Sequence, residues 1–229
     1  MKKLFTLLAC SFLLLAAKAQ TVDEIINKHI DAMGGKQKLL TLKTLVREGA
    51  LNYNGMDLPI TLSSEQGKGF RMDINVMGTV GYQILTPTEG WSYMPFQGQS
   101  TVEKMNEEDV KNSADELDIQ GEFLDYAAKG HKVEFIGKEK VDGKDMFHLK
   151  LTPKQGLVRD VYLDASTYYI AKISGVEKGN VVEVSYSNYQ KTPEGFVVAN
   201  TLTRAEGDVI FTKVTTNGTL PDNIFKAGN

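Results

Sequence analysis

Val181-Val-Glu-Val-Ser-Tyr-Ser-Asn-Tyr189 alternates apolar and polar side chains, with Val182, Val184 and Tyr186 on one face of an extended strand and polar residues on the other. Two more segments rich in β-branched residues follow it, each after a short turn that contains Gly. The pattern predicts antiparallel strands in a sheet with one apolar face and one polar face. Whatever covers the apolar face then determines what the protein can bind.

The same alternation appears in the N-terminal half of the chain. Phe70 and Met72 share one face of the segment 69–77, while Arg71 and Asp73 share the other. We therefore expect both halves to contribute strands to one sheet. Gly, Asn or Pro residues lie near the ends of the expected strands, which cover residues 44–53, 58–66, 69–77, 79–86, 90–95, 132–138, 144–152, 157–163, 169–174, 181–189, 196–204 and 209–214.

Helices are expected at two places. Thr21-Val-Asp-Glu24 fits a capping box that opens an N-terminal helix, and Gly34-Gly35 fits its end. A short second helix is expected over 36–41. Between the two groups of strands, residues 106–130 break the period of two, because their apolar residues recur at helical steps. A helical insertion of this kind is a natural cover for the apolar face of the sheet.

The composition fits an exported globular protein. The chain has 229 residues, 41% of them hydrophobic and 24% charged, which suits one domain, expected over 20–229. Residues 1–19 contain an apolar core after two lysines and a small-x-small ending, which predict a signal peptide cleaved before Gln20. Leu7-Leu-Ala-Cys10 also resembles a lipoprotein attachment motif. Too few apolar residues precede Cys10 for that, so soluble export is favoured over a lipid anchor.

The charge balance limits the class of partner. Removal of residues 1–19 takes away three lysines and no acid, so the net charge moves from −3 to −6. An acidic chain disfavours nucleic acid or an anionic membrane surface as a partner. The mature chain would also lack cysteine, and therefore disulfides and thiol chemistry.

The sequence shows none of the common catalytic signatures. It contains no G-x-S-x-G, phosphate loop, G-x-G-x-x-G, C-x-x-C or H-E-x-x-H motif. His29, His131 and His148 lie far apart and lack a second metal ligand at a signature spacing; His148 is better read as a solvated or half-buried strand residue. We therefore predict no enzyme, no metal and no cofactor, and rank a hydrolase assembled from distant residues lowest.

One stretch is richer in methionine and aromatic residues than is usual for a short strand. Trp91-Ser-Tyr-Met-Pro-Phe96 holds the only tryptophan and follows Met77, Val80, Tyr82 and Ile84. Methionine and aromatic side chains together form adaptable apolar walls that accept irregular ligands. The alternative is that these side chains fill an ordinary core between sheet and helices.

Several of these features together resemble a known family. The signal peptide, the N-terminal helix, Gly69-Phe70-Arg71, the Glu89–Phe96 segment and the ending Asn217–Phe225 are similar to the LolA family of periplasmic lipoprotein carriers. The resemblance covers most of the mature chain. It implies a mainly β (α+β) fold, an unclosed antiparallel β-barrel of about eleven strands with helices covering its concave apolar face. It also implies a periplasmic monomer that receives lipoprotein acyl chains and has lipoprotein-sorting partners in the envelope.

The resemblance and the apolar stretch together give a predicted ligand wall. Its members are apolar or aromatic: Phe70, Met72, Met77, Tyr82, Trp91, Tyr93, Met94, Phe96 and Phe123. Phe70 matches an aromatic residue that lines the carriers' cavity. The arginine that bonds to their lid, four residues earlier, is replaced here by Gln66, which can still bond to a lid carbonyl but without a charge-assisted hydrogen bond.

Two hypotheses of different kinds follow. The first is a periplasmic carrier that holds a lipoprotein acyl chain or another hydrophobic ligand in the hollow of the sheet. The second is a non-catalytic structural or interaction module of the envelope, whose hollow is filled by its own helices. The space left inside the sheet distinguishes the two.

Overall fold

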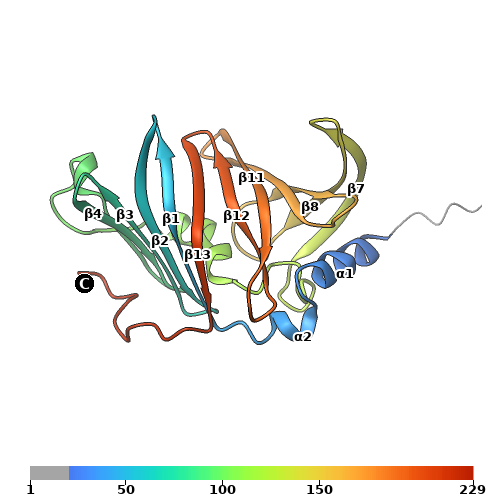
Figure 1. Cartoon of the computed structure of the whole chain (residues 1–229), viewed down its shortest axis with the longest axis horizontal. Helices are drawn as coiled ribbons and strands as arrows, with labels where there is room; N and C mark the ends of the chain where they lie inside the picture. The colour runs from blue at the N-terminus through green and yellow to red at the C-terminus, as the bar shows by residue number, and fades with distance from the viewer. Residues whose placement is uncertain (1–20, 229) are drawn as a thin grey trace, which may run out of the picture.

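The computed structural model describes residues 21–228; the signal peptide predicted at 1–19 and the question of Cys10 lie outside them. Thirteen strands form one antiparallel sheet in the order β6-β5-β4-β3-β2-β1-β13-β12-β11-β10-β9-β8-β7 (Figure 1). Their bounds are β1 (Thr44–Tyr53), β2 (Met56–Glu65), β3 (Gly69–Val76), β4 (Thr79–Leu85), β5 (Gly90–Tyr93), β6 (Glu103–Lys104), β7 (Lys132–Val141), β8 (Lys144–Thr152), β9 (Arg159–Asp164), β10 (Ile170–Glu177), β11 (Asn180–Lys191), β12 (Val197–Arg204) and β13 (Gly207–Thr216). The two edges, β6 and β7, do not pair, so the predicted open antiparallel sheet is confirmed. It has thirteen strands rather than about eleven.

The connectivity explains why a segment must cross the sheet. Successive strands pair as neighbours from β1 out to the edge β6, and again from the opposite edge β7 back to β13, which pairs with β1. The chain therefore has to travel from one edge of the sheet to the other between β6 and β7. Residues 105–131 make this crossing, and we call them the lid segment.

The N-terminal helices follow the sequence signals. In α1 (Val22–Ala32) the Glu24 N–H donates to Thr21 Oγ1 at 3.2 Å while the Thr21 N–H donates to Glu24 Oε2 at 3.1 Å, so the capping box is confirmed. Gly34 and Gly35 end this helix with positive φ angles, and α2 (Lys36–Leu39) follows. Among residues 21–228, no helix combines the length and apolar character that a membrane span requires.

The lid segment is less helical than its sequence predicts. Only α3 (Glu107–Asn112) and the 3-10 helix η2 (Ala114–Leu117) are regular, and residues 118–130 form successive turns. Gly121 and Asp125 adopt φ angles of 94° and 52°, outside the range of a right-handed helix, which interrupts the helical spacing. The prediction of a cover over the apolar face holds, although most of the cover is not helix.

Two hydrophobic clusters lie between the sheet and its cover. The first is centred under α1 and contains Ile25, Phe147 and Leu149 together with Phe123 of the lid segment. The second extends over both halves of the sheet and contains Phe70 and Phe211 together with Val110 and Leu117 of the lid segment, among other residues. The lid segment thus belongs to both clusters and connects them.

The C-terminal segment packs on the opposite face of the sheet, along β3 and β4. Arg71 Nη1 donates to the Ile224 carbonyl at 3.2 Å, and the Gly228 N–H donates to Tyr82 Oη at 3.0 Å. A Cβ on Gly69 would lie 2.4 Å from the Phe225 ring, so the absence of a side chain there makes room for that ring. This segment therefore covers part of the outer face of β3 and β4, while Val110 and Leu117 of the lid segment pack with Phe70 on the concave face.

Candidate ligand cavity

Two cavities lie on the concave face of the sheet, beneath the lid segment. One has a volume of about 250 Å³ and extends from α1 past Arg47 to Ala199. The other has a volume of about 200 Å³ and is lined by Phe70, Met72 and other apolar side chains. Glu116 of η2 lines both, so η2 stands between them. Each is smaller than the roughly 300–1,000 Å³ of ordinary ligand pockets, but together they fall within that range.

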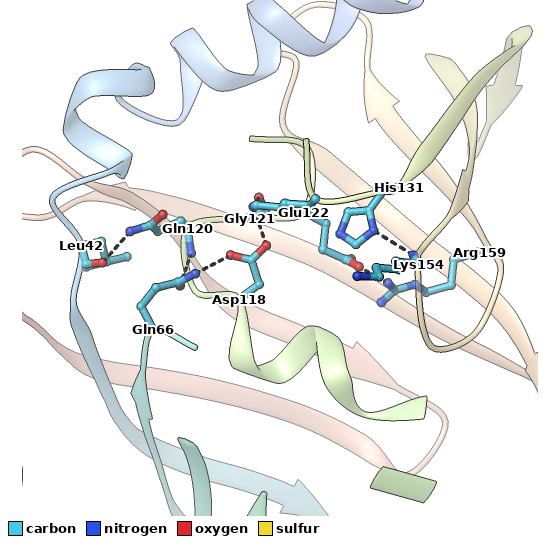
Figure 2. A network of polar contacts seen from close by, with 10 residues as sticks. Leu42, Gln66, Asp118, Gln120, Gly121, Glu122, His131, Lys154 and Arg159 are labelled. Atoms are coloured by element: carbon cyan, nitrogen blue, oxygen red, sulfur yellow. Dashed lines mark hydrogen bonds and ion pairs between the residues drawn. The ribbon is translucent and has the colours of Figure 1, made fainter. Parts of the chain in front are cut away.

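Polar contacts hold the lid segment to the turn between β2 and β3 (Figure 2). Gln66 Nε2 donates to Asp118 Oδ1 at 2.9 Å, and the Gln120 N–H donates to Gln66 Oε1 at 3.2 Å. The Gly67 N–H also donates to the Leu117 carbonyl at 2.8 Å. Gln66 therefore bonds to the lid segment as predicted. Its acceptor, however, is a carboxylate and not a carbonyl, so the hydrogen bond is charge-assisted after all.

A second group of contacts holds the lid segment at β9. Arg159 forms ion pairs with Asp115 and Glu122, one through each terminal nitrogen. Lys129 Nζ lies 2.6 Å from Asp118 Oδ2, within the lid segment itself. Figure 2 shows Arg159 on one side of the lid segment and Gln66 on the other. The lid segment is thus attached through side chains on both sides of the hollow.

Charged and phenolic groups also face the hollow. Burial lowers the pKa of Arg47, and the nearby carboxylate of Glu116 opposes that shift. Burial, followed by the charge of Asp115, raises the pKa of Glu116. Burial, followed by the charge of Glu116, raises the pKa of Tyr186 to about 12. The interior is therefore apolar in its walls but contains ionisable groups at its centre.

Arg47 faces the hollow because strand alternation puts it in phase with Leu45 on the concave side of β1, and both residues line the larger cavity. The register of β1 against β13 shifts between Glu48 and Gly49, which places Phe211 opposite Gly49. The guanidinium of Arg47 lies 4.7 Å from the centre of the Phe211 ring. Within residues 21–228 Arg47 makes no hydrogen bond and no ion pair; its favourable neighbours are this ring and the charge of Glu116.

The structure brings some of the predicted wall residues to the cavities. Phe70 and Met72 line the smaller cavity, and Phe123 lines the larger one. Met94 and Phe96 pack over Gly81, where a Cβ would lie 2.5 Å from the Phe96 ring. Strand alternation puts Gly81 on the concave face, so these two side chains cover that face beside the smaller cavity without lining it.

The other predicted wall residues lie elsewhere. Tyr82 and Tyr93 are paired across β4 and β5 with ring centroids 5.7 Å apart, and Tyr82 stacks on Arg71 on the outer face of the sheet. Trp91 is paired with Ile84 on that same outer face. Met77 is 92% exposed at the turn between β3 and β4. None of these four residues faces either cavity.

Sequence reasoning also missed residues that do face the cavities. Arg47, Glu116, Tyr186 and Ala199 all contribute to the larger one. The alternation of side chains along the first strand could have identified Arg47, because Arg47 is in phase with Leu45 on the apolar side of that strand. An arginine on an apolar face is a candidate for a buried or ligand-binding role.

Comparison with known proteins identifies the fold. No protein-family model matches the sequence, and no curated protein matches it. Three of the solved structures that share the architecture illustrate it. A structure described as an outer membrane lipoprotein-sorting protein domain from Vibrio parahaemolyticus has a TM-score of 0.54 at 18% identity, covering 89% of this chain and 95% of that one. A LolA superfamily protein from Nitrosomonas europaea has a TM-score of 0.55 at 14% identity, covering 90% and 98%. A DUF1329 family protein from Desulfovibrio piger has a TM-score of 0.51 at 13% identity, covering 91% and 98%.

Proposed function

We propose that this chain, which has the fold of the LolA superfamily, carries a lipoprotein acyl chain or another hydrophobic ligand in the hollow between its sheet and its lid segment. The observation that supports this most directly is the pair of cavities beneath the lid segment. A well-packed core leaves few voids larger than a water molecule, so two cavities of this size on one apolar face are unusual.

The energetics suit a binding protein without catalytic groups. Each CH₂ of a chain moved from water into an apolar site contributes about 0.8 kcal/mol. A chain longer than either cavity must move η2, because Glu116 and its neighbours separate the two spaces. The lid segment is held by a few hydrogen bonds and ion pairs in addition to apolar packing. Since a single hydrogen bond contributes only about 0.5–1.5 kcal/mol net, burial of several CH₂ groups can offset the opening of these contacts.

The setting we propose is the periplasm. The signal peptide predicted at residues 1–19 would export the chain, with residues 20–229 as one monomeric domain. The description of the Vibrio parahaemolyticus structure as a lipoprotein-sorting domain supports envelope partners that deliver or receive the ligand. A non-enzymatic role fits the same proposal.

The alternative is an interaction module with a self-filled hollow. It is favoured by the burial of Val110 and Leu117, two lid residues that pack into the second cluster, and by the small volume of each separate cavity. In that case the lid segment would be a permanent part of the core, and partners would bind on the outer surface.

Uptake of a neutral fluorescent probe, N-phenyl-1-naphthylamine, separates the two functions. The carrier predicts saturable uptake by the wild type. Ala199→Trp places an indole in the larger cavity and should weaken uptake by about 10-fold or more, the equivalent of 1.4 kcal/mol. Trp91→Phe changes the outer face and should bind as the wild type does. Circular dichroism verifies that both variants are folded. No uptake by the wild type, or equal uptake by Ala199→Trp, would favour the self-filled module.

A further inference from the structure

We propose that the ligand of this hollow is a single-chain amphiphile with an anionic head group, which Arg47 and Arg204 bind while its chain lies in the cavity lined by Phe70 and Met72. The inference rests on the carrier function and specifies its ligand class. Two arginines, one carboxylate and their positions relative to the cavities support it.

The first observation is the state of Arg47. Its guanidinium sits at the centre of the concave face, where it lines the larger cavity and lies over Phe211. Among the residues that the structure describes, none accepts a hydrogen bond from it. Arg47 is half-buried, and a guanidinium has five N–H donors, none of which another described residue accepts here. The side chain is therefore suited to a ligand that brings its own acceptor oxygens.

The second observation is that Arg47 has a like-charged neighbour. Arg204, near the end of β12, lines the smaller cavity, and its charge contributes to the low pKa of Arg47. Arg204 likewise forms no ion pair within residues 21–228. Two cations directed at one apolar hollow repel each other, and an anion between them relieves that repulsion.

The third observation is the position of the counter-charge. Glu116 is the carboxylate that lines both cavities, and it attracts both arginines without forming an ion pair with either. Glu116 belongs to η2, the element that must move for a chain to enter. Movement of η2 would remove the negative charge and leave Arg47 and Arg204 facing the hollow together. An anionic head group would restore the balance, whereas a neutral ligand would not.

The hydrogen-bonding chemistry of arginine limits the class of head group that the ligand can have. A guanidinium binds carboxylate and phosphate oxygens with paired hydrogen bonds. Fatty acids and single-chain phosphate esters both present such a group at the end of one alkyl chain. Dodecanoate and dodecyl phosphate represent the two sources, and methyl dodecanoate is the neutral match for the first.

The test is displacement of the neutral probe by these compounds from the full-length folded protein. In the wild type, dodecanoate or dodecyl phosphate should displace the probe at a concentration about 10-fold lower than methyl dodecanoate. If dodecanoate displaces the probe at a lower concentration than dodecyl phosphate, the head group is a carboxylate; the reverse order indicates a phosphate. In Arg47→Gln the preference for an anion over methyl dodecanoate should fall to about 2-fold or less. Lys213→Gln removes the same charge from an exposed ion pair with Glu48 and should behave as the wild type does.

Each remaining outcome also decides the question. Equal displacement by charged and neutral compounds in the wild type, or an undiminished preference in Arg47→Gln, would overturn the head-group assignment and leave the carrier function standing. Failure of the probe to bind at all would overturn both. If Arg47→Gln does not fold, Arg204→Gln provides the test, because Arg204 is an exposed residue at the end of β12, beside a hairpin turn.

Discussion

His29 connects three parts of the molecule through one buried imidazole. Its Nδ1 lies 2.8 Å from the Tyr168 carbonyl, which fixes Nδ1 as the protonated nitrogen, and its ring meets Phe123 of the lid segment edge-on at 5.4 Å. Burial lowers the pKa of His29 from 6.5 to about 4, with the bond to the Tyr168 carbonyl acting in the opposite direction. The imidazole is therefore neutral in the folded chain at neutral pH.

This shift predicts a pH-dependent stability. Between pH 6.5 and pH 4 the unfolded chain binds a proton at His29 that the folded chain does not, so the free energy of unfolding falls as the pH falls. At 1.36 kcal/mol per pKa unit, the loss is roughly 3 kcal/mol across this range. Urea unfolding at a series of pH values measures it. His29→Gln should flatten the curve over the same range, and an identical slope in that variant would show that His29 is not the cause.

A second single-residue prediction concerns the stability of the fold and the close packing around Gly49. A Cβ at this position would lie 2.0 Å from the Ile210 carbonyl oxygen, a backbone atom that cannot move aside easily. Gly49→Ala should therefore destabilise the fold by about 3 kcal/mol, the upper part of the usual range for overpacking. Gly137→Ala is a matched control, because this glycine also lies in a strand at a register shift and has open space around it. Equal urea midpoints for the two variants would contradict the close approach of β1 and β13.

The candidate site could be predicted from the sequence only in part. Apolar residues in phase with one another, such as Phe70 and Met72, were correctly placed on one face. Trp91 was not, because its face depends on the pairing of β5 with β4, and the sequence does not specify that register. Arg47 was overlooked because a charge is ordinarily assigned to the wet face of a strand.

At the scale of elements, the proposed carrier function depends most on the stability of the lid segment. Gln66→Ala removes both side-chain hydrogen bonds that join the turn between β2 and β3 to Asp118 and Gln120. At roughly 1 kcal/mol each, their loss should lower the free energy of local opening by about 2 kcal/mol and speed amide exchange near residues 117–130 by about 30-fold.

Hydrogen–deuterium exchange measures this opening directly. Gln190→Ala is the control, since Gln190 makes one exposed hydrogen bond on β11, to Asn188. Exchange in the lid segment should be unchanged in that variant. Unaltered exchange in Gln66→Ala would mean that packing of Val110 and Leu117, and not the polar contacts, keeps the lid segment closed.

Most helices and strands could be predicted from local sequence patterns. The lid segment is the part of the chain for which such patterns gave the wrong secondary structure. Strands and the capped helix α1 depend on alternation, capping and turn residues that lie within a few positions of one another. Residues 118–130 have helical spacing, but long-range contacts such as those of Asp118 and Glu122 hold them as turns. Contacts between residues far apart in sequence leave no periodic signal.

At the scale of the whole molecule, topology creates the hollow. The chain must cross from the edge β6 to the edge β7, and it does so over the concave face, where it covers the apolar surface without filling it (Figure 1). The same crossing places Glu116 between the two cavities. The cover of the apolar face and the position of both cavities beneath it are therefore consequences of one connection.

A crystal structure of the protein grown with a terminally brominated dodecanoate tests the carrier function most directly, because the anomalous signal of bromine locates the end of the chain. We expect the bromine between the sheet and the lid segment, beside Phe70 and Met72, with η2 displaced from its present position. Bromine found only on the outer face, or both cavities empty and η2 unmoved in a crystal saturated with the compound, would contradict the account.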